Sequence, residues 1–547
     1  MLKKEVILMK KHILRFLALI LVCCLLTGCG VSDPASKLAS AILNSSNLDV
    51  TSFDQMVYTH PNLEKLEASL EKACDAAAKD DFRVLIRSIY EFYDLYDAFD
   101  TSYTLADIHY CTDLTDEYWE EEYNYCLSIS SRVDAMLEEL YCALAKSPCL
   151  EYLESDTYFG TGFFDSYQDQ EPWDEAFTAL LEQESALISR YYELTALGNA
   201  YEPGSEEYFE ACYEEMAQIL ADLVPIRQQI AWYWGYEDFA QFAADNYYYR
   251  DYDLSQTEAY LREVQQQLTP LYTRFLANVE WGDAFAWVTE TQTHDWLQNI
   301  AMNMGGTVAE CFLIMDQGKL YDIGYSENKY PASFETYIVN YQVPYVFLAP
   351  YETEYDYLVF AHEFGHFCND SVAYGSYAGM DVQEFFSQGM EYLALCYAED
   401  AQQLIQVKMA ESLAIYVEQS AYSAFEMALY RLPAEQITPE TIRDLFARTA
   451  ADYGIDYEGF DTRYFVAVNH FFTDPMYVLS YVVSNDAAMQ LYQLEQETPG
   501  VGLARYQENL GKEEYYFLSF LQGAGLESPF APGRLNEVAN TFAEILS

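Results

Sequence analysis

Two histidines and a glutamate with the types and spacing of a hydrolytic metal site occur in the run His362-Glu363-Phe364-Gly365-His366. On an α-helix, positions i and i+4 share a face, so the imidazoles of His362 and His366 can bind one zinc ion together. Glu363 lies beside the first histidine, where its carboxylate can take a proton from water held by the metal. The preceding residues 353–361, with Thr353 as a candidate cap, favour a helix. The alternative is two solvent-exposed histidines on an ordinary helix.

A catalytic zinc site typically takes a third protein ligand, and the candidates downstream are Glu384 and Glu391. Asp381, with Glu384 three residues later, indicates a helix start, and the helix is expected to reach about residue 397. A loop over residues 367–380 would let this helix return against the two histidines. Glu391 points nearly the same way as Glu384 but about 10 Å further along the axis. Spacing alone therefore leaves the choice between the two glutamates open.

Both segments resemble the thimet oligopeptidase and oligoendopeptidase F family of zinc metallopeptidases. Members of that family carry the helix motif and then a Glu-x-x-Ser-Gln motif, which Glu384, Ser387 and Gln388 match. Many members have a further histidine three residues after the second ligand, where this chain has Asn369, and the link between the two motifs is shorter than usual. These departures bear on the subfamily and its substrate preference, because no ligand or base is missing.

The resemblance implies specific roles for the residues of the two motifs. It implies one zinc ion per chain, bound by His362, His366 and Glu384, with Glu363 as the catalytic base. It also favours Glu384 over Glu391 as the third ligand. The activity implied is hydrolysis of short peptides.

A third matching segment lies near the C-terminus and contains His470, Tyr477 and Tyr481. It is similar to a late family segment whose histidine and tyrosines line the active site and stabilise the tetrahedral intermediate, and a weaker similarity covers residues 227–252. Tyr477 and Tyr481 are four residues apart, so on a helix they would share one face. The alternative is an aromatic stripe in the core, in a chain that has 51 tyrosines.

The N-terminus has the features of a secretory signal that ends in a lipidation site. Basic side chains precede an apolar run over residues 16–26, which is shorter than the roughly 20 residues of a spanning helix. The run ends in Leu26-Thr27-Gly28-Cys29, which resembles the bacterial lipobox. We expect residues 1–28 to be a signal peptide, Cys29 to carry a lipid that anchors the protein at the extracytoplasmic face of a bacterial membrane, and residues 29–47 to be a tether. A plain signal peptide is the alternative.

The composition is strongly acidic and excludes some classes of partner. The 547 residues include 88 Asp and Glu against 28 Lys and Arg, a formal charge of −60. Such a surface repels nucleic acids and anionic lipid headgroups. An aromatic content of 16 % argues against disorder. We expect oligopeptides as partners, membrane contact only through the lipid anchor, no nucleic acid, and a monomer.

The cysteines do not form the pattern of a disulfide scaffold or of a thiolate metal site. Nine of the twelve lie after Cys29, scattered and without Cys-x-x-Cys spacing. Most are expected to be small core residues. One or two disulfides are compatible with the spacing, and Cys142 with Cys149 is the first pair to test.

Apolar periodicity predicts a mostly helical chain. Leu63, Leu66 and Leu70 share one stripe, and helices are also expected over residues 133–144, 175–197, 206–234 and 255–278. Residues 337–348 are the exception and predict two short strands around Pro344.

The expected architecture is a multi-helix, two-lobed zinc peptidase with a small β-sheet near the active site. We place an N-terminal helical lobe at residues 48–300 and the catalytic domain at residues 301–547. In the family, such lobes flank a deep central channel that admits short peptides and excludes folded proteins.

The function predicted from the sequence is that of a lipid-anchored zinc endopeptidase acting on short peptides. One alternative is a zinc carboxypeptidase on a related helical scaffold, which would need a basic residue to bind the substrate's C-terminal carboxylate. Another is a peptide-binding lipoprotein with little turnover, although the presence of Glu363 argues against it.

Overall fold

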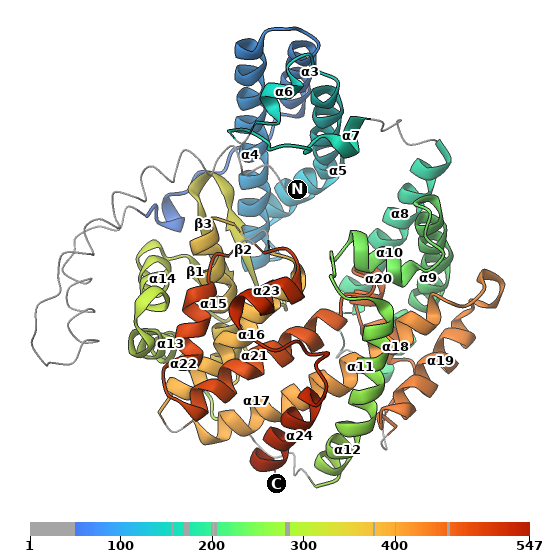
Figure 1. Ribbon diagram of the computed structural model, residues 1–547, viewed down its shortest axis with the longest axis vertical. Coiled ribbons are helices and arrows are strands. Elements are labelled where there is room, and N and C mark those ends of the chain that lie inside the picture. Colours follow the sequence, from blue (N-terminus) through green and yellow to red (C-terminus); the bar gives the residue numbers. More distant parts are fainter. Residues whose placement is uncertain are drawn as a thin grey trace, which may run out of the picture. The chain divides into compact units, whose positions relative to one another are not determined.

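A computed structural model of the chain describes residues 50–155, 157–168, 175–198, 201, 205–278, 285–375, 378–399, 401–456, 460–512 and 514–546 (Figure 1). The structure is 71 % helical and contains one small three-stranded sheet, which confirms the expected fold class. Among the helices of these ranges, none combines the length and the hydropathy needed to cross a bilayer. The predicted signal peptide, Cys29 and the tether lie outside the described residues.

The chain forms two compact units, each built from two stretches of sequence. The first unit comprises Met1–Pro172 and Gly305–Tyr351, and the second comprises Trp173–Met304 and Glu352–Ser547. Only the described residues of each unit are considered below. The units therefore interleave along the chain, whereas one boundary between residues 300 and 301 was expected. That boundary stays a prediction about folding domains, as do the central channel and the position of the sheet relative to the active site.

The first unit is a bundle of helices with a short sheet. Its helical segments are η1 (Phe53–Gln55), α3 (Leu63–Ala77), α4 (Phe82–Thr112), α5 (Glu117–Ala145), α6 (Leu150–Leu153), α7 (Asp165–Gln168), α14 (Gly306–Gly318) and η2 (Val339–Tyr341). The predicted stripe on α3 is confirmed, since Leu66 and Leu70 are buried against α4 and α5. The side chain of Asn62 caps α3 by accepting the N–H of Lys65 at 2.8 Å.

The sheet consists of β1 (Tyr321–Asp322), β2 (Phe334–Ile338) and β3 (Val343–Phe347), in the order β1-β3-β2. Two strands were predicted here, but Pro344 lies inside β3 rather than between strands, where it pairs with Tyr337 of β2. Along β3, the N–H groups of Val346 and Leu348 point toward β1, to the carbonyl oxygens of Leu320 and Asp322. Residue 344 lies two positions before Val346, so its backbone nitrogen faces the same side. No residue of β1 lies opposite it, so a proline, which has no N–H, breaks no hydrogen bond there.

The second unit is built of helices, and among its described residues an isolated β-bridge joins Trp287 and Thr353. Its α-helices are α8 (Glu175–Gly198), α9 (Glu206–Tyr233), α10 (Phe239–Asn246), α11 (Leu254–Gln267), α12 (Thr269–Asn278), α13 (Glu290–Met304), α15 (Asp356–Ala373), α16 (Met380–Tyr397), α17 (Gln402–Ala414), α18 (Ser420–Leu429), α19 (Pro439–Asp452), α20 (His470–Thr473), α21 (Leu479–Glu497), α22 (Val501–Asn509), α23 (Phe517–Ala524) and α24 (Arg534–Ile545). Its other helical turns are a π-helical turn, η3 (Ile415–Gln419), and the 3₁₀ turns η4 (Ala434–Gln436) and η5 (Tyr464–Ala467).

The helix expected over residues 255–278 is two helices, α11 and α12. The break falls at Leu268, two residues before Pro270. Proline has no N–H to donate to the preceding turn, and its ring clashes with the carbonyl four residues earlier. The helix therefore ends and restarts, with Pro270 in the first turn of α12, where no N–H bond is lost.

No disulfide joins any of the nine cysteines in the described part of the chain. Cys142 and Cys149, the first pair to test, are therefore not bridged in the structure. Cys149 is buried and directs its thiol toward the carbonyl oxygen of Lys79 at 3.8 Å.

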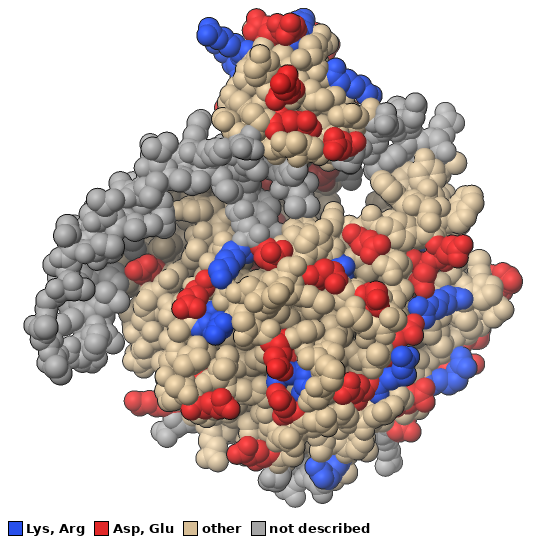
Figure 2. Space-filling view, in the orientation of Figure 1, with Lys and Arg blue, Asp and Glu red and all other residues tan. Residues whose placement is uncertain are grey.

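Acidic side chains are spread over the visible face of the molecule, with basic side chains interspersed among them (Figure 2). The negative charge on this face is thus distributed rather than gathered into one patch. Such a surface attracts cationic molecules over a long range. This attraction does not favour a cationic residue at one particular position of a bound peptide.

Candidate active site

Helix α15 carries His362, Glu363 and His366 on two successive turns. It begins at Asp356 with Tyr355 as the N-cap and without a side-chain cap, so Thr353 is not the cap that the sequence suggested. The helix continues to residue 373, well into the segment 367–380 that was expected to be a loop, and the next helix begins at Met380.

Helix α16 returns from this loop, and its start differs from the prediction. Gly379 is the N-cap, and Asp381 lies within the first turn instead of capping it. The carboxylate of Asp381 is buried, accepts a hydrogen bond from the hydroxyl of Tyr252 at 2.7 Å and lies 3.7 Å from the guanidinium of Arg250. Asp381 therefore ties the start of α16 to residues 250–252, because a buried carboxylate needs such partners.

Gly365 allows α15 and α16 to approach until their backbones touch. A Cβ at this position would lie 2.5 Å from the carbonyl oxygen of Phe386 and 2.6 Å from Cα of Ser387. The hydroxyl of Tyr506 donates to the same Phe386 carbonyl at 3.0 Å. This close approach places Glu384 opposite the two histidines.

Gly365→Ala is therefore expected to destabilise the protein by about 1–3 kcal/mol, because the added methyl group overpacks a backbone contact. The site should also lose affinity for metal, since α16 must shift. Gly523→Ala in α23 is the matched control: a Cβ there meets nothing within 4 Å, and alanine favours a helix. Thermal unfolding and metal content of the two variants test this, and equal stability would show that the helices can separate without cost.

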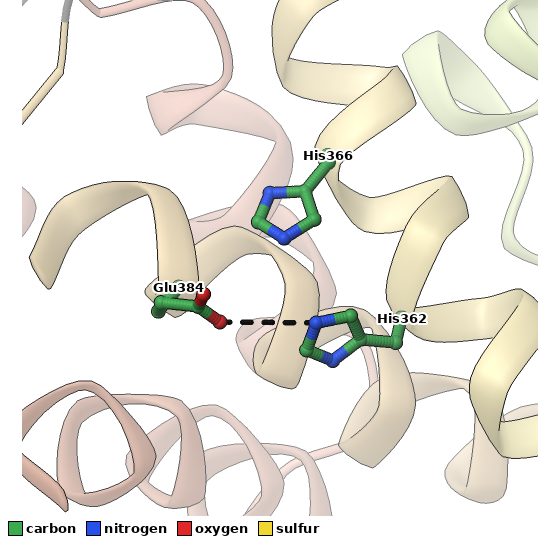
Figure 3. Close-up of side chains that lie close together, drawn as sticks. All are labelled: His362, His366 and Glu384. Atoms are coloured by element: carbon green, nitrogen blue, oxygen red, sulfur yellow. Dashed lines mark ion pairs between the residues drawn. The ribbon is translucent and has the colours of Figure 1, made fainter. Parts of the chain in front are cut away.

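The donor atoms of His362, His366 and Glu384 converge. They all lie within 4.8 Å of one another, and Nε2 of His362 is 3.8 Å from Oε2 of Glu384. The histidines project from α15 and the glutamate from α16 toward a common point (Figure 3). Two imidazole nitrogens and one carboxylate oxygen form a ligand set that zinc uses in catalytic sites. The residues thus fit a single zinc ion.

Glu391, the rival for the third ligand, contacts the other side of the His362 ring. Its carboxylate lies 2.8 Å from Nδ1 of His362 and accepts a hydrogen bond from the ammonium of Lys408 at 2.6 Å. Both Glu391 and Lys408 are buried. A carboxylate on Nδ1 favours the tautomer whose Nε2 is free to bind metal. Lys408 was not predicted from the sequence, because its partner lies on another helix.

Glu384 is itself held by two hydroxyl groups. The hydroxyl of Tyr477 donates to Oε1 at 2.9 Å, and the hydroxyl of Ser387 lies 3.1 Å from Oε2. Oε2 is also the oxygen that faces His362. These contacts fix the carboxylate of Glu384 with one oxygen toward the histidines.

The structure brings His470, Tyr477 and Tyr481 together beside Glu384. The imidazole of His470 stacks on the ring of Tyr477 at 4.6 Å, and its Nε2 lies 3.4 Å from the hydroxyl of Tyr481. The two tyrosines do not share a helical face, because α21 begins at Leu479. Tyr477 lies in the preceding turn, where Met476 has a φ of +69°. Their rings nevertheless meet, with centroids 5.1 Å apart.

Burial and neighbouring charges shift the pKa values of the site residues in different directions. Burial, reinforced by Glu384 and Glu391 and opposed by His362, raises the pKa of Glu363 to about 7. Burial lowers the pKa of His366 to about 4. Burial also disfavours the charged form of His362, but the hydrogen bond and charge of Glu391 outweigh it and raise the pKa of His362 to about 9. A carboxyl with a pKa near neutrality suits a general base.

A cavity of about 470 Å³ opens beside His362 and Glu363. Its walls come from α15, α16, α17, η3 and Tyr481. This volume lies in the range of small-molecule sites. The cavity therefore offers space for part of a ligand next to the candidate base.

Comparison with protein families gives a match over part of the chain. Residues 53–171 match the Peptidase M3 N-terminal domain. This segment belongs to the first unit and contains none of the site residues. Compared with curated protein sequences, the chain shows no significant match.

Several solved peptidase structures have the same fold as this chain. A structure of PZ peptidase A with an inhibitor superposes with a TM-score of 0.77 at 19 % identity, over 90 % of this chain and 99 % of that one. A protein assigned as oligoendopeptidase F from Bacillus anthracis strain Ames gives 0.73 at 20 % identity, over 91 % and 98 %. Oligoendopeptidase F from Enterococcus faecium gives 0.51 at 14 % identity, over 88 % and 96 %. At these identities, the likeness shows the fold.

Proposed function

We propose that the protein is a zinc-dependent oligopeptidase of the Peptidase M3 family, of the thimet oligopeptidase and oligoendopeptidase F type. The observation that carries the proposal is the convergence of the donor atoms of His362, His366 and Glu384 beside the buried Glu363. The family match over residues 53–171 and the shared fold support it independently of these residues. The experiment that tests it is the zinc dependence of peptide hydrolysis, measured by titrating zinc into metal-free protein.

The protein's own side chains have distinct tasks in this reaction. A bound zinc ion would supply Lewis-acid polarisation of the scissile carbonyl and a lower pKa for the attacking water. Glu363 accepts the proton of that water and passes it to the nitrogen of the leaving amine. Glu391, fixed by Lys408, holds the ring of His362 in one orientation.

Tyr481 is the best-placed group to stabilise the negative charge that develops on the substrate oxygen. Its side chain lines the cavity next to Glu363. Burial, reinforced by Glu384, raises the pKa of Tyr481, so the hydroxyl keeps its proton and can donate. His470 lies 3.4 Å from this hydroxyl and positions it. A preformed donor of this kind contributes about 2.7–4 kcal/mol to transition-state stabilisation.

Tyr481→Phe and His470→Ala are each expected to lower kcat at least tenfold, or about 1.4 kcal/mol. KM should change little, because the interaction forms in the transition state. Tyr477→Phe should in addition weaken zinc binding, since it removes the hydrogen bond to Glu384. Tyr453→Phe is the control, because it removes a buried hydroxyl that bonds the carbonyl of Leu261. If steady-state kinetics show no slower turnover in Tyr481→Phe, its ring is only part of the core.

The alternative of a carboxypeptidase requires a cation for the substrate's terminal carboxylate. Of the described residues lining the cavity, Lys408 is the one lysine or arginine, and its ammonium is bound to Glu391. This favours an endopeptidase. Internally quenched peptides with an amidated C-terminus decide the matter, because a carboxypeptidase would leave them intact.

The proposed location is the extracytoplasmic face of a bacterial membrane, with a lipid on Cys29. Its support is the sequence Leu26-Thr27-Gly28-Cys29 after a basic and apolar leader. Cys29→Ser should abolish incorporation of labelled fatty acid and move the protein out of the membrane fraction. Unchanged labelling in this variant would refute lipidation at this residue.

A further inference from the structure

The cavity beside Glu363 has walls rich in hydrogen-bond acceptors. Besides Glu363 and Glu391, its described lining includes the half-buried carboxylates of Glu411 and Glu418. Of its described residues, Lys408 is the one lysine or arginine, and its ammonium is already bound to Glu391 at 2.6 Å. The described lining therefore has four carboxyl groups against one lysine and the imidazole of His362.

Gln388 is the second and independent observation. Its side chain is 2 % exposed, and its Nε2 donates to Oγ of Ser484 at 3.0 Å, with the carbonyl of Tyr481 at 3.4 Å. A carbonyl can only accept, so the amide orientation is set by these partners. The opposite atom, Oε1, is buried, and among the described residues no donor lies within hydrogen-bond distance of it. A buried acceptor without a partner is costly unless a ligand donates to it.

The far wall of the cavity repeats this pattern. Oε1 of Gln419 is also a buried acceptor with no donor in the described part of the chain. The adjacent Glu418 accepts a hydrogen bond from the hydroxyl of Tyr272, which leaves its other oxygen for a further contact. Burial, reinforced by the charge of Glu391, raises the pKa of Glu411 to about 7, against the charge of Lys408 and a hydrogen bond with Tyr355.

We propose that this cavity is a specificity subsite that binds an arginine or lysine side chain of the peptide substrate next to the scissile bond, through Glu411, Glu418 and the amide oxygens of Gln388 and Gln419. The inference rests on the proposed peptidase function and deepens it. A guanidinium has five N–H donors and no acceptor, which matches a lining of acceptors. Its charge would offset the excess of carboxylates, and its stem would contact the apolar Leu358, Val359 and Ile415 of the lining.

The test compares internally quenched peptides that carry either arginine or citrulline at one position. Citrulline has nearly the same shape without the charge, and the residue is moved step by step along the peptide. We expect kcat/KM for arginine to exceed that for citrulline by at least about tenfold at one position only. Glu411→Gln and Glu418→Gln should each reduce this ratio. Glu508→Gln, which removes an exposed carboxylate on α22, should leave the ratio unchanged.

The outcomes separate the subsite from the proposed function. Equal rates for arginine and citrulline at every position, or a ratio unaffected by both pocket variants, would overturn the subsite and leave the peptidase standing. A preference spread over all positions and removed by salt would also overturn it, because long-range attraction is screened. If the zinc-loaded protein cleaves no peptide, the proposed function fails. Calorimetric binding of the same peptide pairs to the wild type and Glu411→Gln then decides the subsite by itself.

Discussion

Replacing Glu363 by glutamine is expected to leave one bound zinc ion per chain and to lower kcat by about 10²–10⁴-fold. The carboxylate of Glu363 is buried beside His362, and its pKa is raised toward neutrality. Glutamine has the same size but cannot accept the proton of the attacking water. The three proposed zinc ligands keep their donor atoms in this variant, so the metal should remain.

Metal analysis and steady-state kinetics on the same preparation separate these effects. Glu508→Gln is the matched control, since it removes a carboxylate from the exposed face of α22. Wild-type turnover in Glu363→Gln would show that another group acts as the base. Loss of zinc with loss of activity would show that Glu363 holds the metal rather than the proton.

The second large effect concerns the choice between two glutamates. Glu384→Gln is expected to abolish stoichiometric zinc binding, because Oε2 of Glu384 faces Nε2 of His362. Glu391→Gln should still bind zinc, but with an affinity about 10–100-fold lower, as is found for other groups that orient a metal ligand. Removing Glu391 also leaves the ammonium of Lys408 buried without its partner, which should lower stability.

Zinc titration of the two metal-free variants measures the zinc dissociation constant of each. Lys408→Met combined with Glu391→Gln serves as a control, because it removes the buried ion pair without leaving a lone charge. If Glu391→Gln lost zinc and Glu384→Gln retained it, the ligand role would pass to Glu391. The arrangement described above would then be wrong at its third ligand.

Local patterns predicted the parts of the site that lie within one helix. His362, Glu363 and His366 are placed by the periodicity of α15 alone, and the stripe on α3 follows the same rule. The choice between Glu384 and Glu391 depends on how closely two helices approach. That distance is set by the missing side chain of Gly365 against the backbone of α16. Spacing along the chain carries no such information.

The wrong details share a physical cause, since tertiary partners override local preference. Asp381 has the sequence position of a cap, but Tyr252 and Arg250 engage its carboxylate. Pro344 is a residue typical of turns, but it lies inside β3, at a position where the sheet requires no backbone N–H donor. Lys408 was not foreseen because its partner, Glu391, lies on another helix. Each of these depends on residues distant in sequence.

The central claim is tested most directly by titrating zinc into metal-free protein while measuring bound metal and the hydrolysis of a mixed peptide library in parallel. The account predicts that activity appears in proportion to bound zinc and reaches its maximum at one ion per chain. In Glu363→Gln, the same titration should bind one zinc ion without restoring hydrolysis. Peptide cleavage by the metal-free protein at the full rate, or a zinc-loaded wild type that cleaves no peptide in the library, would contradict the account.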